Sequence, residues 1–498
     1  MRRLADVVVV GNGAVGLSVA VEIARRAPEL KVSVVGPAER TRAASVAAGA
    51  MLNCFGEVTT YTRRHPASEA RFAVARQALD LWPQWLAALE EDAGGAAAAA
   101  VRASWSEGTF VIMSSSSGRI AGENFAAMCA TAAELGEPHE LVAPKEVAGL
   151  SPRLGHRPLQ VLHLRREGAV DGRALVAALE RAAHERSVEL VPATVRSLLR
   201  ASDGAVSGVE LEDGAAVAAG VVVLAAGAAS GALADQVLPP GAVPPMQHGT
   251  GLAVTVQRVN TGPRGPHVIR TPNRAGTCGL HVVPLAGQNE QYIGATNVIA
   301  LDPAPGVHLG LAQTMMRQAS EQVDQALAVA YVHRWLTGTR PIPLDCYPLI
   351  GPCSVPGLLF ATGTYRDGFH GSPAIARHLA TTLLRSTTEE KDTPFAHFAP
   401  ERMPIETMSV REAVDDTARH AADTMHDQGT SMPWWLDSTP LEEWARERVR
   451  AFYESLEDPV ALPPEVVDPQ FLDPTAIETR AVGLLRRYLR AARAHHAT

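Results

Sequence analysis

Three glycines near the start of the chain have the spacing of a phosphate-binding turn. Gly11, Gly13 and Gly16 follow a segment at 5–10 that is dominated by an unbroken β-branched run, and they lead into a segment with helical periodicity at 14–27. The first glycine permits a tight bend, the second lets the backbone approach a pyrophosphate, and the third lets helix and strand pack closely. The helix N-terminus then faces the anion. The sequence therefore predicts a dinucleotide site.

The usual acidic ligand of the ribose is missing. Residues 31–35 predict the second strand of the unit, and the next residue is Gly36. Losing one charge-assisted hydrogen bond costs about 1.5–3 kcal/mol, which an FAD held by many contacts tolerates better than an exchangeable NAD. Glu39 or Arg40 is a candidate to reach the ribose or adenine, and Arg40 also leaves open a 2′-phosphate and hence NADP.

Helices and short buried strands alternate along the rest of the first 400 residues. Gly94–Ala100 reads as a loop or a soft helix end. Alternating polarity at 251–258, 280–284 and 291–295 predicts antiparallel strands that form one wall of a cavity. The predicted strands are 108–113, 188–191, 206–211, 220–226 and 357–362, of which the last two are expected to be buried. The predicted helices are 67–91, 172–186, 309–329 and 373–384, the last with Pro373 near its start.

Prolines recur from about residue 395, with amphipathic helices between them. Thr439-Pro440-Leu441-Glu442 reads as a capping box, and 475–494 as a further helix. Trp434 and Trp435 would suit an interface. Residues 403–498 are therefore expected to be a helical C-terminal extension, a candidate contact surface for a partner, a second copy or the parent chain.

Composition excludes several classes of function. The 498 residues hold 45 Lys and Arg against 53 Asp and Glu, a formal net charge of −8, so no basic footprint for nucleic acid is present. Apolar runs are interrupted before about 18 residues, so we expect no membrane span. The five cysteines include no CxxC, which argues against a disulfide framework or a zinc ribbon and favours a reducing, cytoplasmic compartment. The histidines lack metal-ligand spacing, so no metal is expected.

Four further blocks join the glycine turn in a family resemblance. They are AASVAAGAML at 43–52, VVVLAAGAAS at 221–230, GTRPIPLDCYPLIG at 338–351 and GLLFATGTYRDGFHGSP at 357–373. In this order they resemble the D-amino-acid oxidase/glycine oxidase superfamily of FAD enzymes, with glycine oxidase most similar in its motifs. The resemblance covers roughly residues 5–400.

The resemblance implies an α/β fold with a discontinuous Rossmann-like FAD-binding domain and a mainly antiparallel substrate domain. We predict that residues 1–72, 151–238 and 335–402 form the FAD-binding domain, that 73–150 and 239–334 form the substrate domain, and that 403–498 form the extension.

The resemblance also implies which residues hold the FAD. Ser45 and Gly49 would lie by the pyrophosphate and ribityl chain, and Val195 by the adenine. Sarcosine-oxidase-like relatives attach FAD to a cysteine, but Cys346 directly follows Asp345 and does not match that position, so non-covalent FAD is favoured. The implied cofactor residues are Gly11, Gly13, Ala14, Val15, Gly16, Arg42, Ser45, Ala48, Gly49, Met51, Val195, Ala226, Gly227, Gly338, Arg340, Gly363, Tyr365, Arg366, Asp367, Gly368 and Phe369.

The substrate end of the site contains arginines and histidines. Arg340 matches the carboxylate-binding arginine of amino-acid-oxidising members, and its alternative is a structural pair with Asp345. Arg366 matches a second arginine near the carboxylate, or else braces its loop. His281, His370 and His248 are candidate titratable contacts to the substrate, or else ordinary hydrogen-bonding residues.

The expected activity is oxidation of a small amino acid or N-substituted glycine. Hydride would pass from the α-carbon to flavin N5, and O2 would then accept the electrons to give an imine or keto acid and H2O2. The altered pocket and the extension favour a specialised biosynthetic pathway. The alternative is an FAD-dependent dehydrogenase of a 2-hydroxy acid or polyol phosphate with another electron acceptor.

Overall fold

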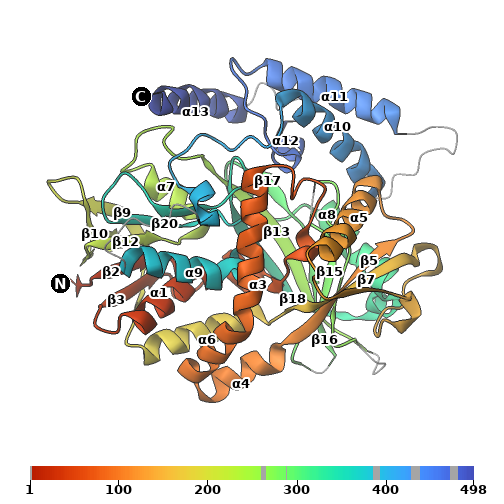
Figure 1. The fold of residues 1–498 in the computed structure, drawn as a ribbon, viewed down its shortest axis with the longest axis horizontal. Coiled ribbons are helices and arrows are strands. Elements are labelled where there is room, and N and C mark those ends of the chain that lie inside the picture. The colour runs from red at the N-terminus through yellow and green to blue at the C-terminus, as the bar shows by residue number, and fades with distance from the viewer. Residues whose placement is uncertain are drawn as a thin grey trace.

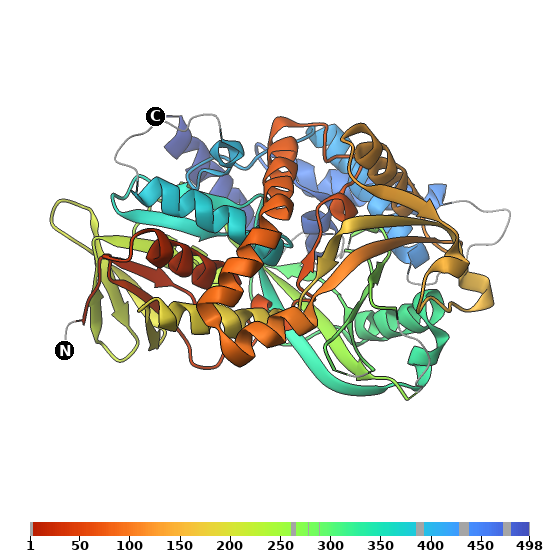
Figure 2. The ribbon, with the colours of Figure 1, turned by 60° about the horizontal axis from the view of Figure 1, so that its bottom comes forward.

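Two large β-sheets stand side by side, with helices on their outer faces and C-terminal helices across one end (Figures 1 and 2). The computed structural model describes residues 3–259, 265–276, 278–287, 289–384, 393–427, 438–471 and 480–497. Helix α3 (Pro66–Ala93) runs between the two halves in both views. No helix of these residues has the length and apolar character needed to cross a membrane.

The six-stranded sheet carries the glycine turn. Its order is β19-β20-β12-β2-β3-β8, and all its pairs are parallel except β19 with β20. Val7 and Val9 of β2 enter one hydrophobic core, while Val8 and Val10 enter another, which explains the unbroken β-branched run. The bounds are β2 Val7–Val10, β3 Val32–Gly36, β8 Glu189–Pro192, β12 Val221–Leu224, β19 Leu349–Pro352 and β20 Leu358–Thr362.

A small sheet, ordered β1-β11-β10-β9, extends this half of the molecule. Its bounds are β1 Arg3–Leu4, β9 Val195–Arg200, β10 Val206–Leu211 and β11 Ala216–Ala218.

The second large sheet is mostly antiparallel. Its main path is β17-β13-β16-β15-β14-β5-β7-β4, with β18 paired to β13 and β6 to β7. The β13–β18 register places Arg340 opposite Gly249. The bounds are β4 Met51–Leu52, β5 Ser106–Ser114, β6 His139–Val142, β7 Pro158–Ala169, β13 Met246–Gln257, β14 Val268–Arg270, β15 His281–Pro284, β16 Glu290–Gly294, β17 Val298–Ala300 and β18 Tyr331–Pro343.

Two helix predictions need correction at their ends. The alanine-rich segment predicted as a loop or a soft helix end belongs to a separate helix, α4 (Gly95–Ser104), because alanine is the best helix former and Val101 is buried. The helix predicted at 309–329 ends as α8 at Gln318 and continues as short π and 3-10 turns. The other α-helices of this part are α1 Ala14–Arg26, α2 Ala44–Ala47, α5 Arg119–Glu134, α6 Gly172–Glu185 and α7 Ser230–Ala234.

The prediction that Pro373 begins a helix is wrong. Helix α9 runs from Gly368 to Leu384, so Pro373 lies inside it. A proline there has no N–H to give to the carbonyl one turn earlier. The Phe369 carbonyl instead accepts a hydrogen bond from Ser372 Oγ at 2.9 Å, which satisfies the group that the proline leaves open.

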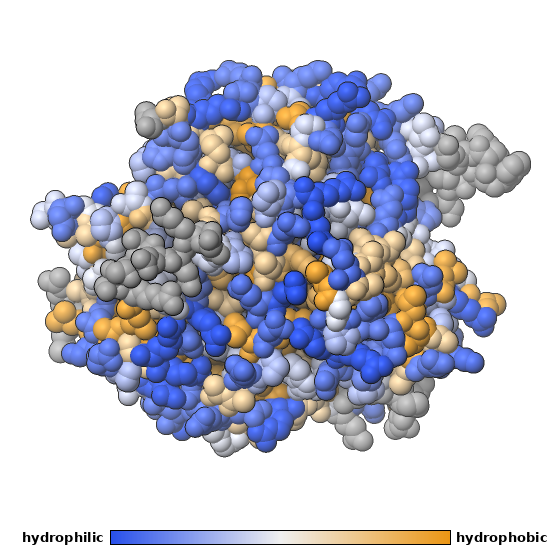
Figure 3. All heavy atoms as spheres, viewed as in Figure 1, coloured by the Kyte–Doolittle hydropathy of each residue, from blue (hydrophilic) through white to orange (hydrophobic). Residues whose placement is uncertain are grey.

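The C-terminal extension packs on its own chain. Helices α10 (Val410–Asp427), α11 (Thr439–Glu454), α12 (Pro464–Phe471) and α13 (Arg480–His496) share one hydrophobic core with Ile342, Leu344 and Tyr365. Their outer surface is mostly hydrophilic (Figure 3). A contact with a partner or a second copy stays a prediction, and Trp434 and Trp435 lie outside the described residues.

The expected capping box at 439–442 is wrong, because the N-cap residue of α11 makes no side-chain hydrogen bond to the N–H groups of the first turn. Thr439 is the first residue of α11 and Ser438 occupies the N-cap position, where its Oγ lies 3.0 Å from Glu442 Oε1.

Asp345 fastens the start of the extension to the body. Its side chain is fully buried and pairs with Arg402 at 2.9 Å, while the Ile405 and Tyr347 N–H groups each donate to it at 3.0 Å. The alternative in which Asp345 pairs with Arg340 is therefore wrong. A buried carboxylate with this many donors fixes the path of the chain from the last strands into the extension.

We expect Asp345→Ala to lower the free energy of unfolding by about 3–5 kcal/mol, because it leaves the Arg402 guanidinium without its buried partner. Denaturant unfolding measures this. The control is Asp415→Ala, because Asp415 is half exposed and pairs with Arg446 on the surface, where the loss should stay below about 1 kcal/mol. Equal losses in the two variants would contradict the role of Asp345.

Candidate active site

A cavity of about 730 Å³ extends from the glycine turn to the large antiparallel sheet. Of the two candidates for the ribose or adenine, Arg40 lines it and Glu39 does not. The residues that the family resemblance assigns to cofactor or substrate line it too, with the exception of Gly16 and Gly363. Both exceptions are packing positions. A Cβ on Gly16 would lie 2.0 Å from the Gly11 carbonyl oxygen, and Gly363 has φ +70° against Pro343. The two glycines therefore shape the walls without facing the cavity.

The glycine turn presents backbone donors to the cavity. Gly11 has φ +117°, and a Cβ there would lie 2.2 Å from the Ala225 carbonyl oxygen. Gly13 is the N-cap residue of α1, whose first turn contains no acid. Ser45 Oγ accepts from the Ala14 N–H at 3.0 Å, which holds the 43–52 segment against the helix N-terminus. This arrangement suits an anion such as a pyrophosphate.

Asn12 occupies the space that the usual ribose-binding acid would need at position 36. A Cβ on Gly36 would lie 2.3 Å from Asn12 Cγ, so Asn12 fills the space into which a side chain at position 36 would extend. Asn12 Nδ2 donates to the Pro37 carbonyl at 2.9 Å, and Arg40 Nε donates to the Asn12 carbonyl at 2.8 Å. Arg40 also pairs with Glu180. Although Arg40 lines the cavity, these contacts engage its guanidinium and argue against a 2′-phosphate site.

Arg340 lies at the other end of the cavity with a fixed guanidinium. Its Nη1 donates to the Thr296 carbonyl and to Asn297 Oδ1, each at 3.1 Å. Gly251 makes room for it, since a Cβ there would lie 2.4 Å from Nη1. Within the described part of the chain, no carboxylate forms an ion pair with Arg340. Its remaining N–H groups are therefore available to a ligand carboxylate.

Tyr365 connects the two arginines of the site. Its hydroxyl oxygen accepts from Asn297 Nδ2 at 3.1 Å and from Arg366 Nη2 at 2.8 Å. The Arg366 guanidinium lies over the Tyr365 ring and also reaches Glu465 Oε1 of α12 at 3.5 Å. Arg366 thus faces the cavity and braces its loop at once. Burial raises the pKa of Tyr365, so its hydroxyl keeps a proton that it can donate to a ligand.

His281 presents an unprotonated nitrogen. Its Nδ1 lies 3.1 Å from the Gly279 carbonyl, so this nitrogen carries the hydrogen and Nε2 carries the lone pair. The ring stacks on Tyr292, and Gly49 leaves space beside Nε2. Burial and the nearby Arg270 lower the pKa of His281 to about 4, so the imidazole is neutral at pH 7.

The other two histidines have different surroundings. His370 Nε2 donates to the Ala75 carbonyl at 2.7 Å, which attaches α9 to α3, and burial lowers its pKa. His248 is half-buried on β13. Burial lowers its pKa, although the negative charge of Asp302 acts in the opposite direction. Both rings line the cavity as neutral hydrogen-bonding groups.

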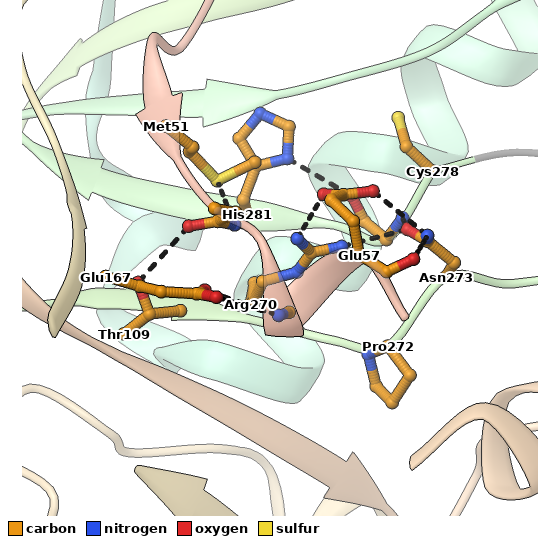
Figure 4. Close-up of polar contacts among 12 residues, drawn as sticks. Met51, Glu57, Thr109, Glu167, Arg270, Pro272, Asn273, Cys278 and His281 are labelled. Carbon is orange, nitrogen blue, oxygen red and sulfur yellow. Dashed lines mark hydrogen bonds and ion pairs between the residues drawn. The ribbon is translucent and has the colours of Figure 1, made fainter. Parts of the chain in front are cut away.

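A buried ion cluster adjoins this end of the cavity, because its members Asn53 and Glu57 line it. Figure 4 shows the polar contacts of the cluster. Arg270 is fully buried, pairs with Glu57 and donates to Asn273 Oδ1 at 2.9 Å. Burial would raise the pKa of Glu57, but Arg270 and Arg366 outweigh it and lower that pKa to about 2. Glu57 lines the cavity as a permanent anion, and sequence reasoning missed it because its partners are more than 200 residues away.

Glu167 is the second acid of this cluster and behaves in the opposite way. Its Oε1 accepts from the Cys54 and Gly56 N–H groups at 2.8 and 3.0 Å. Burial nevertheless raises the pKa of Glu167 to about 7. The Asn53 amide, oriented with its nitrogen 3.3 Å from Glu167 Oε2, accepts from Arg270 Nη1 at 2.7 Å and joins both acids to one arginine.

The cysteines bear on cofactor attachment. Cys346 and Cys54 are buried and line a smaller neighbouring cavity, not the large one. Cys278 does line the large cavity, where its Sγ donates to the Ala295 carbonyl at 3.5 Å. Non-covalent attachment of FAD stays a prediction. Among the residues the structure describes, no group of three or more His, Cys, Asp or Glu side chains could hold a metal ion.

Comparison with known proteins identifies the class. Residues 6–382 match the DAO family model, described as FAD dependent oxidoreductase, so the chain belongs to this family and FAD is its cofactor. The cavity fits that group, because it offers an open helix N-terminus at one end and room beyond it toward the antiparallel sheet. The predicted α/β fold class is confirmed. The match ends before the C-terminal helices.

Two curated relatives are similar in sequence. The chain is 26% identical over 401 residues to glycine oxidase of Geobacillus kaustophilus, covering 78% of this chain and 94% of that protein. It is 27% identical over 400 residues to the bifunctional protein ThiO/ThiG of Trichormus variabilis, covering 79% of this chain but only 54% of that protein. The chain therefore spans about half the length of the ThiO/ThiG protein that it matches.

Solved structures share the fold. The Geobacillus kaustophilus glycine oxidase structure superposes with a TM-score of 0.66 at 22% identity, covering 80% of this chain and 99% of that one. Iminodiacetate oxidase from Chelativorans gives a TM-score of 0.63 at 17% identity, covering 79% and 98%.

We expect Gly13→Val to reduce FAD binding by about 10-fold or more, because even its Cβ would lie 3.0 Å from Ser45 Oγ, where backbone must approach the pyrophosphate. The ratio of visible to ultraviolet absorbance of the purified protein measures cofactor content. Gly310→Ala is the control, since a Cβ there meets open space. A Gly13→Val protein with wild-type FAD content would contradict this assignment of the turn.

Glu167 should also leave a signature in the pH dependence of stability. Because its folded pKa is raised from 4.5 to about 7, the folded state holds this proton to higher pH than the unfolded state. The free energy of unfolding should therefore fall between these two pH values, by about 2–3 kcal/mol. Glu167→Gln cannot titrate and should lack this fall, so its stability relative to wild type should rise between pH 4.5 and about pH 7 and level off above that. Parallel stability curves from denaturant unfolding would contradict the raised pKa.

Proposed function

We propose that this protein is an FAD-dependent oxidase of a small amino acid or N-substituted glycine. The observation that carries the proposal is Arg340, a cavity arginine whose guanidinium is fixed by Thr296 and Asn297 and has no carboxylate partner among the described residues. Planar paired donors of this kind suit a carboxylate. The name of one relative, glycine oxidase, supports the same class of amine substrate.

Arg340 and the side chains around it bind different groups of the substrate. Arg340 holds the substrate carboxylate, which fixes the direction of the bond to be broken at the α-carbon. The neutral His281 Nε2 accepts from the substrate amine, and the Tyr365 hydroxyl donates to the substrate. Bound FAD supplies the hydride acceptor. We further propose O2 as the final electron acceptor, with imine or keto acid and H2O2 as products, and a place in a specialised cytoplasmic pathway.

The alternative is oxidation of a 2-hydroxy acid or polyol phosphate. L-α-glycerophosphate oxidase from Mycoplasma pneumoniae shares the fold, with a TM-score of 0.59 at 16% identity. An alcohol requires a base for its O–H proton. His281, with a pKa lowered to about 4, is a weak base, and His370 Nε2 is occupied by the Ala75 carbonyl. The low pKa of His281 and the occupied Nε2 of His370 therefore favour an amine over an alcohol as the substrate.

We expect Arg340→Ala to lower kcat/KM for a carboxylate-bearing amine by about 100-fold or more, which corresponds to loss of a charge-assisted pair. Steady-state kinetics with glycine and N-methylglycine measure this. Arg334→Ala is the control, because Arg334 lies exposed on the same strand, β18. Equal activity of the two variants would show that the carboxylate binds elsewhere.

A further inference from the structure

A second cavity of about 210 Å³ adjoins the active site. Five residues line both cavities, namely Asn53, Glu57, Tyr365, Arg366 and Asp367. The two spaces therefore meet at a common wall, which contains the Tyr365 and Arg366 side chains described above. A substrate whose carboxylate lies on Arg340 has this wall close to its other end.

The C-terminal extension forms the roof of the second cavity. Asp416, Arg419 and His420 of α10 line it, together with Glu465 at the start of α12. All four lie beyond residue 382, where the family match ends. The roof is thus built by a part of the chain that the shared FAD-binding fold does not include.

Asp416, one of the residues that form this roof, has a carboxylate oxygen without a donor. The residue is 5% exposed, and its Oδ1 accepts from the Tyr61 hydroxyl at 2.6 Å. Its Oδ2 is buried and has no hydrogen-bond donor within the described chain. The closest cationic side chains, Arg419 and His420, lie 3.8 Å from Oδ1 and 3.9 Å from Oδ2, beyond hydrogen-bond distance. A buried carboxylate oxygen of this kind requires a donor.

The other charged groups around the cavity already have partners. Arg71 pairs with Asp367 at 2.7 Å, and Arg419 pairs with Glu123 at 2.6 Å. Arg366 pairs with Glu465, and Asp345 with Arg402. Arg366 Nε is also buried without an acceptor in the described chain, but among the lining carboxylates the unmet demand is for a donor at Asp416. The group that best supplies a donor to a buried carboxylate is an ammonium.

We propose that the second cavity is a binding subsite for a terminal amine of the substrate, with Asp416 as its ligand. The inference rests on the proposed function, because it requires a carboxylate held in the first cavity. The substrate class is then an amino acid or N-substituted glycine that carries a second amine at the end of a flexible chain. The flexible chain of the substrate passes the wall formed by Tyr365 and Arg366. The C-terminal extension of the protein then selects for the amine at the far end of the substrate.

The test uses ligands that have no amine on the α-carbon. A series of ω-amino alkanoates of increasing length is compared with the matching plain alkanoates on the full-length, FAD-loaded protein. Calorimetry and the change in cofactor absorbance measure binding. At the length that spans the two cavities, the amino compound should bind about 10-fold tighter or more than its partner. Equal binding at every length in wild-type protein overturns the proposal without any variant.

A pair of variants assigns the effect to Asp416. Asp416→Asn should abolish the preference for the amino compound while plain alkanoates bind as before. Asp415→Asn is the matched control, because Asp415 lies next to Asp416 on α10 but pairs with Arg446 outside the cavity. A preference that survives in Asp416→Asn also overturns the proposal.

A separate outcome identifies failure of the proposed function. If neither the amino compounds nor the plain alkanoates bind and no amine bleaches the cofactor, the proposal of a carboxylate site at Arg340 is wrong. The proposal of the subsite, which depends on it, is then wrong as well. If glycine is oxidised and alkanoates bind without preference for the amine, only the subsite is wrong.

Discussion

The site depends on one hydroxyl oxygen, that of Tyr365. It accepts from Asn297 on one side and Arg366 on the other, while Asn297 Oδ1 accepts from Arg340. A continuous set of hydrogen bonds therefore joins β18, the turn before β17 and the segment before α9, and Glu465 adds α12 to it. Because each member satisfies its neighbour, the orientation of Arg340 is fixed before any ligand binds, which is the condition for aligning a substrate.

This arrangement explains why the C-terminal extension matters to the active site although it lies outside the family match. Asp345 and Arg402 fix the path of the chain into the extension. The helices then bury an apolar face against Ile342 and Leu344, and α12 presents Glu465 to Arg366. The extension thus acts on the same arginine that faces the cavity, and it closes the space beyond it.

The sequence predicts the nucleotide end of the molecule well because that end is determined locally. The spacing of Gly11, Gly13 and Gly16 dictates a turn that only a few backbone geometries satisfy, and the β-branched run before it predicts a strand buried on both faces. The substrate end is determined by contacts between distant segments. Asn297, Glu57 and Glu465 have no local pattern that marks them, and their partners become visible only in three dimensions.

Errors in element boundaries have similarly specific causes. Pro373 sits inside α9 because Ser372 satisfies the carbonyl that the proline cannot, and the alanines at 96–100 form a helix because Val101 gives that helix a buried side. The predicted domain boundaries and the assignment of individual side chains to cofactor and substrate stay predictions.

The central claim is that a carboxylate-bearing amine is oxidised in the cavity that Arg340 closes. The most direct measurement is anaerobic titration of the purified protein with matched amine and alcohol acids, N-methylglycine or glycine against glycolate, followed by the visible absorbance of the cofactor. The account predicts that an amine bleaches this absorbance and that glycolate leaves it unchanged. Bleaching by glycolate alone would contradict the account and identify an alcohol as the substrate.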